Sequence, residues 1–229
     1  MCGIAGFTET NKELLMQMAG SLRHRGPDGG GFYQDESVSL GMRRLAIVDL
    51  TSGGQPMFNE DKTIVAFQNG EIYNHRELRR ELEKKGHRFH SDHSDTEVIP
   101  HLYEEYGEDW ANHTNGMFAA AIWDKPQKRL LLYRDRLGKK PLYYAQTGEV
   151  LIFGSEIKSL LLHPRISREL DFTSIYHYLG LKNTQAPRTI YRDIRQILPG
   201  EYLIWEKGRL STKKYWNLNF NSIQNEFPF

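Results

Sequence analysis

Apolar side chains recur at helical spacing in two stretches of the chain, residues 11–22 and 95–106, and form one apolar face in each. A third stretch is mostly polar, but Asn74 followed three residues later by Glu77 is typical of a helix start. Gly86 is typical of the end of that helix. The pattern therefore predicts helices over residues 11–22, 74–85, 95–106, 156–162 and 172–179.

Short apolar runs of strand length account for much of the rest. Strands are predicted over residues 2–7, 64–68, 117–124, 129–135, 142–145, 150–155 and 201–206. Residues 38–50 are expected to form two short strands broken near Gly41. Asn69-Gly70 is a common turn dipeptide, and the Gly- and Pro-rich residues 24–31 and 51–56 are predicted loops. A few helices with eight or more strands at hairpin spacing favour an α+β fold of antiparallel sheets covered by helices.

Composition narrows the class of protein. The chain has 229 residues, 39% hydrophobic and 26% charged, with a formal net charge of +1. These values are typical of a folded domain and argue against disorder. The small net charge gives no support for nucleic acid as a partner. No apolar run reaches the roughly 20 residues of a membrane helix, and no secretory signal is recognisable.

The single cysteine, Cys2, follows the initiator methionine. It excludes an intrachain disulfide and a multi-cysteine zinc site, and it favours a reducing, cytoplasmic compartment. Cysteine is small enough for Met1 to be removed, which would place a thiol and a free α-amine on one residue. An amine with a pKa of about 8 is a usable general base for a cysteine nucleophile. The alternative is a chance cysteine in a buried strand.

Three further groups of residues could carry chemistry. The Asn69 side chain and the Gly70 N–H could form an oxyanion hole, or they could be a simple turn. Arg44 could bind a carboxylate. The histidines and acids of residues 87–101, which include His87, His90, Asp92, His93, Asp95, Glu97 and His101, are ligand types that zinc uses. Their spacing matches no metal motif, so no metal site is expected. No phosphate-binding loop is present either.

Seven segments taken together resemble the class II glutamine amidotransferases, whose glutaminase domain is an N-terminal-nucleophile hydrolase. They read MCGIAGF (1–7), RHRGPD (23–28), RLAIVD (44–49), NGEIYN (69–74), SDTEVI (94–99), RDRLGKKPLYY (134–144) and SEIKSL (155–160). RHRGPD with NGEIYN is most similar to the glutaminase half of asparagine synthetases. The resemblance implies an α+β fold that is a four-layer αββα sandwich of two antiparallel sheets.

The resemblance also implies a role for each matching residue. Cys2 would attack the side-chain amide of L-glutamine, with its own α-amine as the base. Asn69 and Gly70 would stabilise the oxyanion, and Arg44 would hold the α-carboxylate of glutamine. Asp95 with Glu71 would hold its α-amino group. The pocket would be lined by Leu45, Ala46, Ile47 and Val48.

The family's synthetases continue into an ATP-using domain, and the sequence ends near the place where their linker begins. Residues 1–210 are therefore expected to be the glutaminase domain and residues 211–229 the start of the linker. Residues 171–200 resemble the part that faces the synthetase domain. No metal or cofactor is expected in this chain, whereas ATP and Mg²⁺ would belong to the synthetase domain or subunit.

The sequence leaves several alternatives open. The ammonia acceptor could be aspartate or another compound, and a homodimer is neither indicated nor excluded. A non-catalytic glutamine-binding module and, less consistent with the residues, a metal hydrolase using residues 87–101 are the competing functions.

Overall fold

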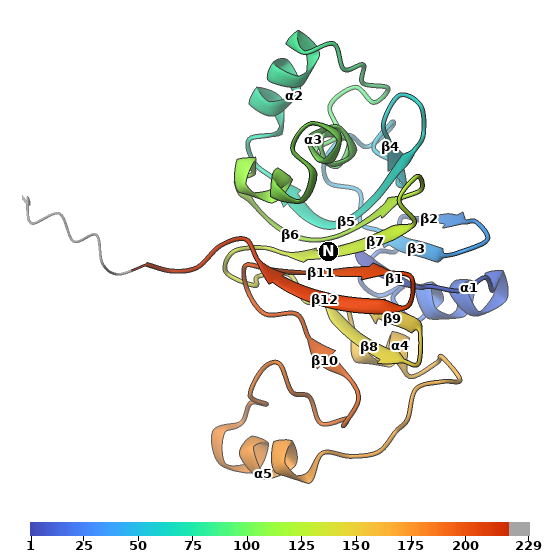
Figure 1. Cartoon of the computed structure of the whole chain (residues 1–229), viewed down its shortest axis with the longest axis vertical. Coiled ribbons are helices and arrows are strands. Elements are labelled where there is room, and N and C mark those ends of the chain that lie inside the picture. Colours follow the sequence, from blue (N-terminus) through green and yellow to red (C-terminus); the bar gives the residue numbers. More distant parts are fainter. Residues whose placement is uncertain (220–229) are drawn as a thin grey trace, which may run out of the picture.

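Two six-stranded antiparallel sheets form the centre of the computed structural model, which describes residues 1–219 (Figure 1). The first sheet has the order β10-β8-β9-β1-β3-β2, with β1 at Gly3–Phe7, β2 at Gly29–Gln34, β3 at Ser39–Arg44, β8 at Tyr143–Thr147, β9 at Val150–Gly154 and β10 at Arg195–Gln196. The second has the order β12-β11-β7-β6-β5-β4, with β4 at Met57–Phe58, β5 at Ile64–Ile72, β6 at Gly116–Asp124, β7 at Arg129–Arg134, β11 at Glu201–Glu206 and β12 at Arg209–Lys214.

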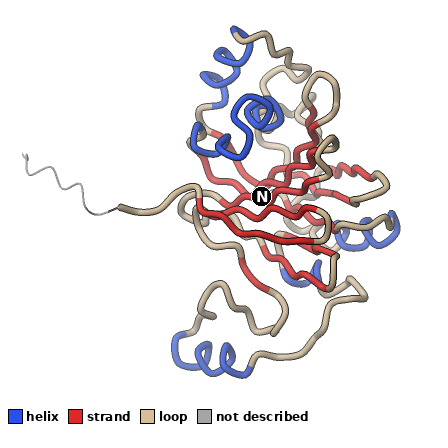
Figure 2. Tube along the Cα trace, viewed as in Figure 1, coloured by secondary structure: helices blue, strands red, loops and turns tan. Residues whose placement is uncertain are grey.

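Helices lie on the outer faces of both sheets (Figure 2). The outer face of the first sheet packs against α1 (Lys12–Gly20) and α4 (Ile157–Leu160). The second sheet packs against α2 (His75–Lys84), α3 (Val98–Tyr106) and the 3₁₀ helix η1 (Gly107–His113). A further helix, α5 (Phe172–Leu181), lies at the periphery. Within residues 1–219, no helix is long and apolar enough to cross a membrane.

Three apolar cores define the layers. One lies between the sheets and includes Phe67, Trp123 and Phe153. The others join each sheet to its helices, for example through Met18 and Trp110. Each large side chain buried in this way contributes about 1.5–3 kcal/mol to folding. The layer order is therefore αββα, which confirms the predicted fold.

The predicted break at Gly41 is wrong. Strand β3 runs unbroken from Ser39 to Arg44, and Gly41 pairs with Ala5 of β1 on one side and Phe32 of β2 on the other. A Cβ at Gly41 would approach the Phe32 ring to 3.0 Å. The glycine makes room for a neighbouring ring within a central strand, so it does not interrupt the strand. Residues 45–48 then leave the sheet.

The predicted turn at Asn69-Gly70 is also wrong. Both residues lie inside β5, where Asn69 pairs with Ala119 and Gly70 with Phe118 of β6. A Cβ at Gly70 would overlap the carbonyl oxygen of Met117. The neighbouring strand, rather than a turn, therefore requires glycine here, and pairing along β6 overrides the turn preference of the dipeptide.

Smaller differences concern element ends. Strand β2 begins inside the predicted loop 24–31, and the short strands β4, β10 and β12 were not predicted. Helix α3 begins at Val98. Asn74 precedes α2 but makes no side-chain cap; its Oδ1 accepts from Asn115 N (2.8 Å) and its Nδ2 donates to the carbonyl of His113 (3.0 Å). These bonds instead tie the start of α2 to the segment before β6.

Candidate functional site

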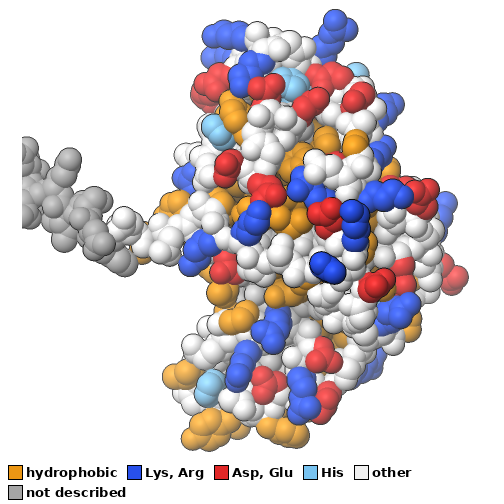
Figure 3. Space-filling view, viewed as in Figure 1, with side chains coloured by type: hydrophobic (Ala, Val, Ile, Leu, Met, Phe, Trp, Pro, Cys, Tyr) orange, Lys and Arg blue, Asp and Glu red, His pale blue; other side chains and the backbone are white. Residues whose placement is uncertain are grey.

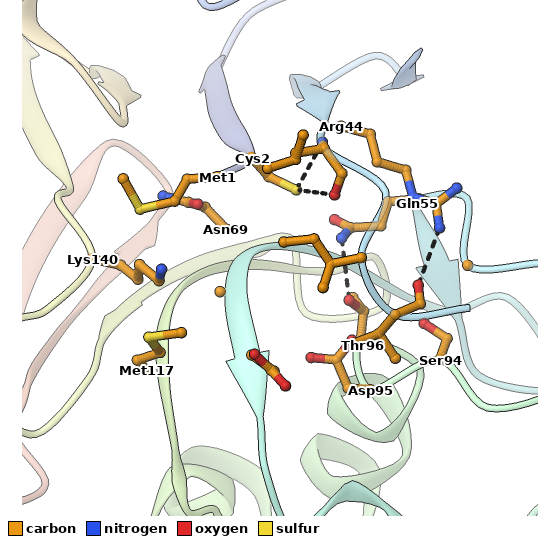
Figure 4. Close-up of a pocket in the computed structure, with 16 residues that line it drawn as sticks. Met1, Cys2, Arg44, Gln55, Asn69, Ser94, Asp95, Thr96, Met117 and Lys140 are labelled. Carbon is orange, nitrogen blue, oxygen red and sulfur yellow. Dashed lines mark hydrogen bonds between the residues drawn. The ribbon is translucent and has the colours of Figure 1, made fainter. Parts of the chain in front are cut away.

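Cys2 lies immediately before β1, a central strand of the first sheet, at one end of a small pocket (Figure 4). The backbone N–H of Leu45 donates to its Sγ (3.4 Å), and Sγ lies 3.6 Å from the Leu45 carbonyl, to which the thiol donates. The thiol is thus oriented by the segment that leaves β3. Burial lowers the pKa of the adjacent Met1 α-amine, and the Arg25 and Lys140 cations lower it further against the opposing Cys2 charge.

A clamp from two distant segments holds the Cys2 backbone. Arg25 Nε donates to the Cys2 carbonyl (2.9 Å), and Arg25 Nη1 donates to Glu156 Oε1 (2.9 Å). Burial raises the pKa of Glu156, but hydrogen bonds from Arg25, His24 and Lys158 outweigh burial and lower it to about 2. The carboxylate stays ionised at neutral pH, so the clamp keeps its charge and fixes the Cys2 backbone.

Across the pocket from β1, strand β5 contributes Asn69 and Gly70. Asn69 is fully buried, yet neither atom of its side-chain amide has a hydrogen-bond partner among residues 1–219. Leaving a buried polar group unpaired costs about 1–3 kcal/mol. Such groups are rare unless a ligand or water satisfies them. Asn69 therefore offers an amide donor to whatever occupies the pocket beside Cys2 (Figure 4).

Arg44, the last residue of β3, lines the pocket on another side. Its Nη2 donates to the carbonyls of Val48 (3.2 Å) and Asp49 (2.5 Å), and these contacts fold residues 45–50 around the guanidinium. Asp49 supports the same turn by accepting from Ser52 N (2.8 Å). Burial raises the pKa of Asp49, but bonds from Ser52 and His93 lower it to about 2. The loop that follows β3 thus holds the Arg44 guanidinium in place at the pocket.

The negative side of the pocket comes from Glu71 of β5 and from Asp95. Asp95 Oδ2 accepts from Ile72 N (2.9 Å) and from Gln68 Nε2 (3.3 Å), so the carboxylate is fixed to the end of β5. Burial raises the pKa of Asp95; the Ile72 N–H counteracts this in part, and the neighbouring charge of Glu71 adds to it. A cation bound between the two carboxylates would offset the cost of burying the Asp95 charge and the repulsion from Glu71.

All but one of the sequence-predicted site residues line this pocket. Cys2, Arg44, Leu45, Ile47, Val48, Asn69, Gly70, Glu71 and Asp95 are among its lining residues. Ala46 is not, and its N–H donates instead to Asp28 Oδ2 (2.9 Å). Asp28 belongs to the RHRGPD segment, which thereby supports the chain next to Cys2.

Sequence analysis missed several lining residues, among them Gln55, Ser94, Thr96, Met117 and Lys140. The side chain of Gln55 hydrogen-bonds to the backbone of β5 at Gln68, as a neighbouring strand would. Its Oε1 accepts from Gln68 N (2.7 Å), and its Nε2 donates to the Gln68 carbonyl and to Thr96 Oγ1, each at 3.1 Å. Residues 51–56 were predicted as a loop, and nothing in that pattern indicates that Gln55 docks on β5.

Lys140 had a signal in the sequence, the RDRLGKKPLYY segment. Arg134 donates to the carbonyls of Lys140 (2.9 Å), Gly138 (2.6 Å) and Ile197 (2.6 Å), while Asp135 accepts the N–H of Lys140 (2.9 Å). This buried pair wraps residues 135–140 into a fixed turn. It presents Lys140 to the side of the pocket away from Arg44 (Figure 4).

Comparison with known proteins identifies the family of this chain. The sequence profile described as "Glutamine amidotransferase domain" matches residues 1–216. The chain belongs to the glutamine amidotransferase family. The segments that hold Cys2, Asn69 and Asp95 all lie within the matched residues.

Relatives of this amidotransferase domain include "Asparagine synthetase [glutamine-hydrolyzing] 3" of Bacillus subtilis, 39% identical over 236 residues, which cover 99% of this chain and 38% of the relative. The corresponding maize enzyme is 45% identical over 168 residues, covering 70% of this chain and 28% of the relative. The chain therefore spans less than two fifths of the length of these synthetases.

Solved structures share the fold. The chain titled "Structure of the allosteric regulatory enzyme of purine biosynthesis" superposes with a TM-score of 0.70 at 20% identity, covering 96% of this amidotransferase domain and 50% of that chain. The glutamine phosphoribosylpyrophosphate amidotransferase of B. subtilis gives 0.65 at 20% identity, with 95% and 50% covered. At this identity the likeness concerns the fold alone.

Proposed function

We propose that this domain hydrolyses the side-chain amide of L-glutamine to glutamate and ammonia through a thioester on Cys2. The observation that carries the proposal is the pairing of a thiol held by Leu45 with the buried, unpaired amide of Asn69 in one pocket. The family membership and the glutamine-hydrolysing relatives support the choice of substrate.

The reaction requires Met1 to be removed, so that the α-amine belongs to Cys2. This amine takes the thiol proton, and the sulfur then attacks the amide carbon. The oxyanion that forms accepts hydrogen bonds from Asn69 Nδ2 and the Gly70 N–H. The C–N bond breaks as the amine returns its proton, and ammonia leaves. Water then adds to the thioester, the C–S bond breaks, and glutamate and the free thiol are released.

The charges around the pocket suit a zwitterionic amino acid. Arg44 would bind the α-carboxylate of glutamine, and Asp95 with Glu71 would bind its α-ammonium group. Leu45, Ile47 and Val48 would contact the aliphatic part. The supporting contacts of Arg44 to residues 48–49 and of Asp95 to Ile72 mean that both groups are held in place before the substrate arrives.

We further propose that the ammonia is used by an asparagine synthetase portion that binds ATP and Mg²⁺, as a domain or subunit in the cytoplasm. The length of the relatives beyond the matched region supports this. Residues 171–200 would face that portion. The linker was predicted to start at residue 211; pairing of β12 through Lys214 and the family match through residue 216 favour a slightly later start. Residues 220–229 of the predicted linker lie outside the described residues.

Glutamate release from L-glutamine by the purified chain tests the proposal. Intact mass should show that Met1 is absent, and turnover should vanish in Cys2→Ala while glutamine still raises the melting temperature of that variant. Turnover that persists in Cys2→Ala would refute the mechanism. Glutamine binding without turnover in the Met1-free chain would instead favour a non-catalytic glutamine-binding module.

A further inference from the structure

Four potential metal ligands converge on the outer side of the second sheet, away from the pocket. Glu60 lies in the turn between β4 and β5, His87 follows α2, and His101 and Glu104 are one turn apart on α3. One ligand atom from each residue lies within 4.8 Å of all the others. Three segments that are distant in sequence therefore bring two imidazoles and two carboxylates together.

The spacing of these atoms matches a tetrahedral ion. Two ligands bound to one Zn²⁺ at about 2.0–2.1 Å lie roughly 3.3 Å apart. His87 Nδ1 lies 3.2 Å from Glu60 Oε1 and 3.8 Å from Glu104 Oε2, and His101 Nδ1 lies 3.4 Å from Glu60 Oε2. Only small side-chain movements would be needed to close the four ligands around an ion.

His101 provides an independent indication. Its side chain is fully buried, and neither ring nitrogen makes a hydrogen bond within the described part of the chain. Nδ1 faces Glu60 without hydrogen-bond geometry. A buried imidazole ordinarily has a partner for at least one nitrogen. A cation between His101 and Glu60 would supply that partner.

The ligands are also held from behind, as metal ligands usually are. His87 Nε2 contacts Glu105 Oε1 (3.1 Å), and Glu105 is in turn paired with Lys85 Nζ (2.6 Å). The Arg88 N–H donates to Glu60 Oε1 (2.7 Å), and Asn59 Nδ2 donates to Glu104 Oε2 (3.3 Å). These contacts hold His87, Glu60 and Glu104 through residues that lie outside the four-residue cluster.

We propose that Glu60, His87, His101 and Glu104 bind one Zn²⁺ as a structural site. Two imidazoles favour zinc over Mg²⁺ or Ca²⁺, which prefer all-oxygen ligand sets. Four protein ligands complete a tetrahedral shell and leave no position for catalysis. Such a site would contradict the expectation from sequence that this chain binds no metal. That expectation was based on residues 87–101 alone, and Glu60 and Glu104 lie outside them.

The site would connect to the pocket through one segment, a loop that leads into the first residues of α3. His87 and His101 flank residues 88–100, and this segment carries Ser94, Asp95 and Thr96 of the pocket wall. Inside the loop, Glu97 already accepts the N–H groups of His90 (2.6 Å) and Ser91 (2.9 Å). Zinc would anchor both ends of the loop to the β4–β5 turn and thereby stabilise the support of Asp95.

The test uses the tag-free chain, stripped with a chelator and titrated with ZnCl₂. We expect one zinc per chain by elemental analysis, a higher melting temperature with zinc, and the intense visible absorption of a tetrahedral site when Co²⁺ is used instead. Glu104→Gln and His87→Gln should lose zinc affinity by more than 100-fold. Glu105→Gln, which changes only an orienting contact, should weaken binding by about 10- to 100-fold.

Matched controls separate this site from adventitious binding. His90→Gln and Glu81→Gln change exposed neighbours outside the cluster and should bind zinc as the parent does. Cys2→Ala should also keep the full stoichiometry. Glu104 lies at the accessible side of the cluster, so its variant is expected to fold even if a His101 variant does not. The proposal would be overturned if zinc binding were not saturable or if it were lost in Cys2→Ala. It would also be overturned if Glu104→Gln and His87→Gln bound zinc as tightly as the parent does.

Discussion

Within residues 1–219, the buried side-chain amide of Asn69 has no hydrogen-bond partner, whereas the equally buried amide of Asn59 is hydrogen-bonded through both its oxygen and its nitrogen. Asn59 Oδ1 accepts from Ile64 N (2.9 Å) and its Nδ2 donates to Thr63 Oγ1 (3.0 Å). The contrast separates two kinds of buried polar residue. Asn59 stabilises the β4–β5 turn, and Asn69 is held in place by β5 while its donors remain available for a ligand.

Asn69→Ala is therefore expected to reduce kcat for glutamine hydrolysis by about 100- to 1000-fold, the typical cost of removing one oxyanion donor. KM should change little, because the bond strengthens only as the oxyanion forms. Steady-state kinetics measures this. Asn59→Ala is the control: it should lower the free energy of unfolding by about 1–3 kcal/mol and leave kcat near that of the parent. A large KM effect with unchanged kcat in Asn69→Ala would contradict the assigned role.

Asp95→Asn should have opposite effects on binding and on stability. Because burial raises the pKa of Asp95, folding favours its neutral form. Its contribution to stability is complete below the unfolded pKa of about 3.9 and is lost as pH rises through the folded pKa. The melting temperature of Asp95→Asn, relative to the parent, should thus increase between pH 4 and pH 8.

Glutamine affinity should fall by about 10- to 100-fold in the same variant, as expected for loss of one charged hydrogen bond. Turnover of the bound substrate should change little. A pH-independent difference in melting temperature would show that the carboxylate is not a destabilising charge in the free domain. A fall in turnover at unchanged affinity would count against contact with the α-ammonium group.

At the scale of elements, β5 shows how one strand serves both sheet and pocket. Its backbone pairs with β6 over its whole length, and its last residues present Asn69, Gly70 and Glu71 to the pocket. Gly70→Ala should push β5 away from the Met117 carbonyl, lower the free energy of unfolding by about 1–3 kcal/mol or more and reduce turnover. Chemical denaturation and kinetics check both effects.

The control for Gly70→Ala is Gly20→Ala. Gly20 is the last residue of α1, and a Cβ there would meet no atom within 4 Å. Since alanine is the better helix former, this variant should be as stable as the parent or slightly more so. If Gly70→Ala were equally benign, the close approach of β6 would not be what requires glycine at this position.

Helices and strands with a regular spacing of apolar residues could be predicted from sequence, whereas contacts between these elements could not. The stripe of α1 and the apolar runs of β6 and β7 are encoded locally, so their positions were right. Asn69-Gly70 and Gly41 were misread because neighbouring strands decide their conformation. Cys2, Asn69, Gly70 and Arg44 were candidates by their chemistry, and the motif resemblance then implied the role of each site residue. Gln55 and the Arg25–Glu156 clamp depend on chain segments that meet only after folding.

For the molecule as a whole, the pocket belongs to both sheets. Cys2 precedes β1 of the first sheet, and Asn69 lies on β5 of the second. The apolar core between the sheets contains Ile4, two residues after Cys2, and Phe67, two residues before Asn69. Packing in that core therefore sets the distance between the thiol and the amide, on which the proposed acyl transfer depends.

Within residues 1–219, the most exposed large apolar side chains lie on α5 (Figure 3), where Phe172, Tyr176 and Leu179 are each at least 75% exposed. Apolar clusters of this kind mark interaction surfaces, and this one lies in the segment expected to face a synthetase portion.

Tyr176→Ser with Leu179→Ser should leave the melting temperature and glutamine hydrolysis unchanged, because these side chains contribute little to the folded core. Binding of a hydrophobic fluorescent dye should decrease, and so should association with a separately expressed synthetase portion. The conservative pair Tyr176→Phe with Leu179→Met should keep both. A large loss of stability in the serine variant would mean that α5 is held against the domain by these side chains, and that the surface for a partner must be sought elsewhere.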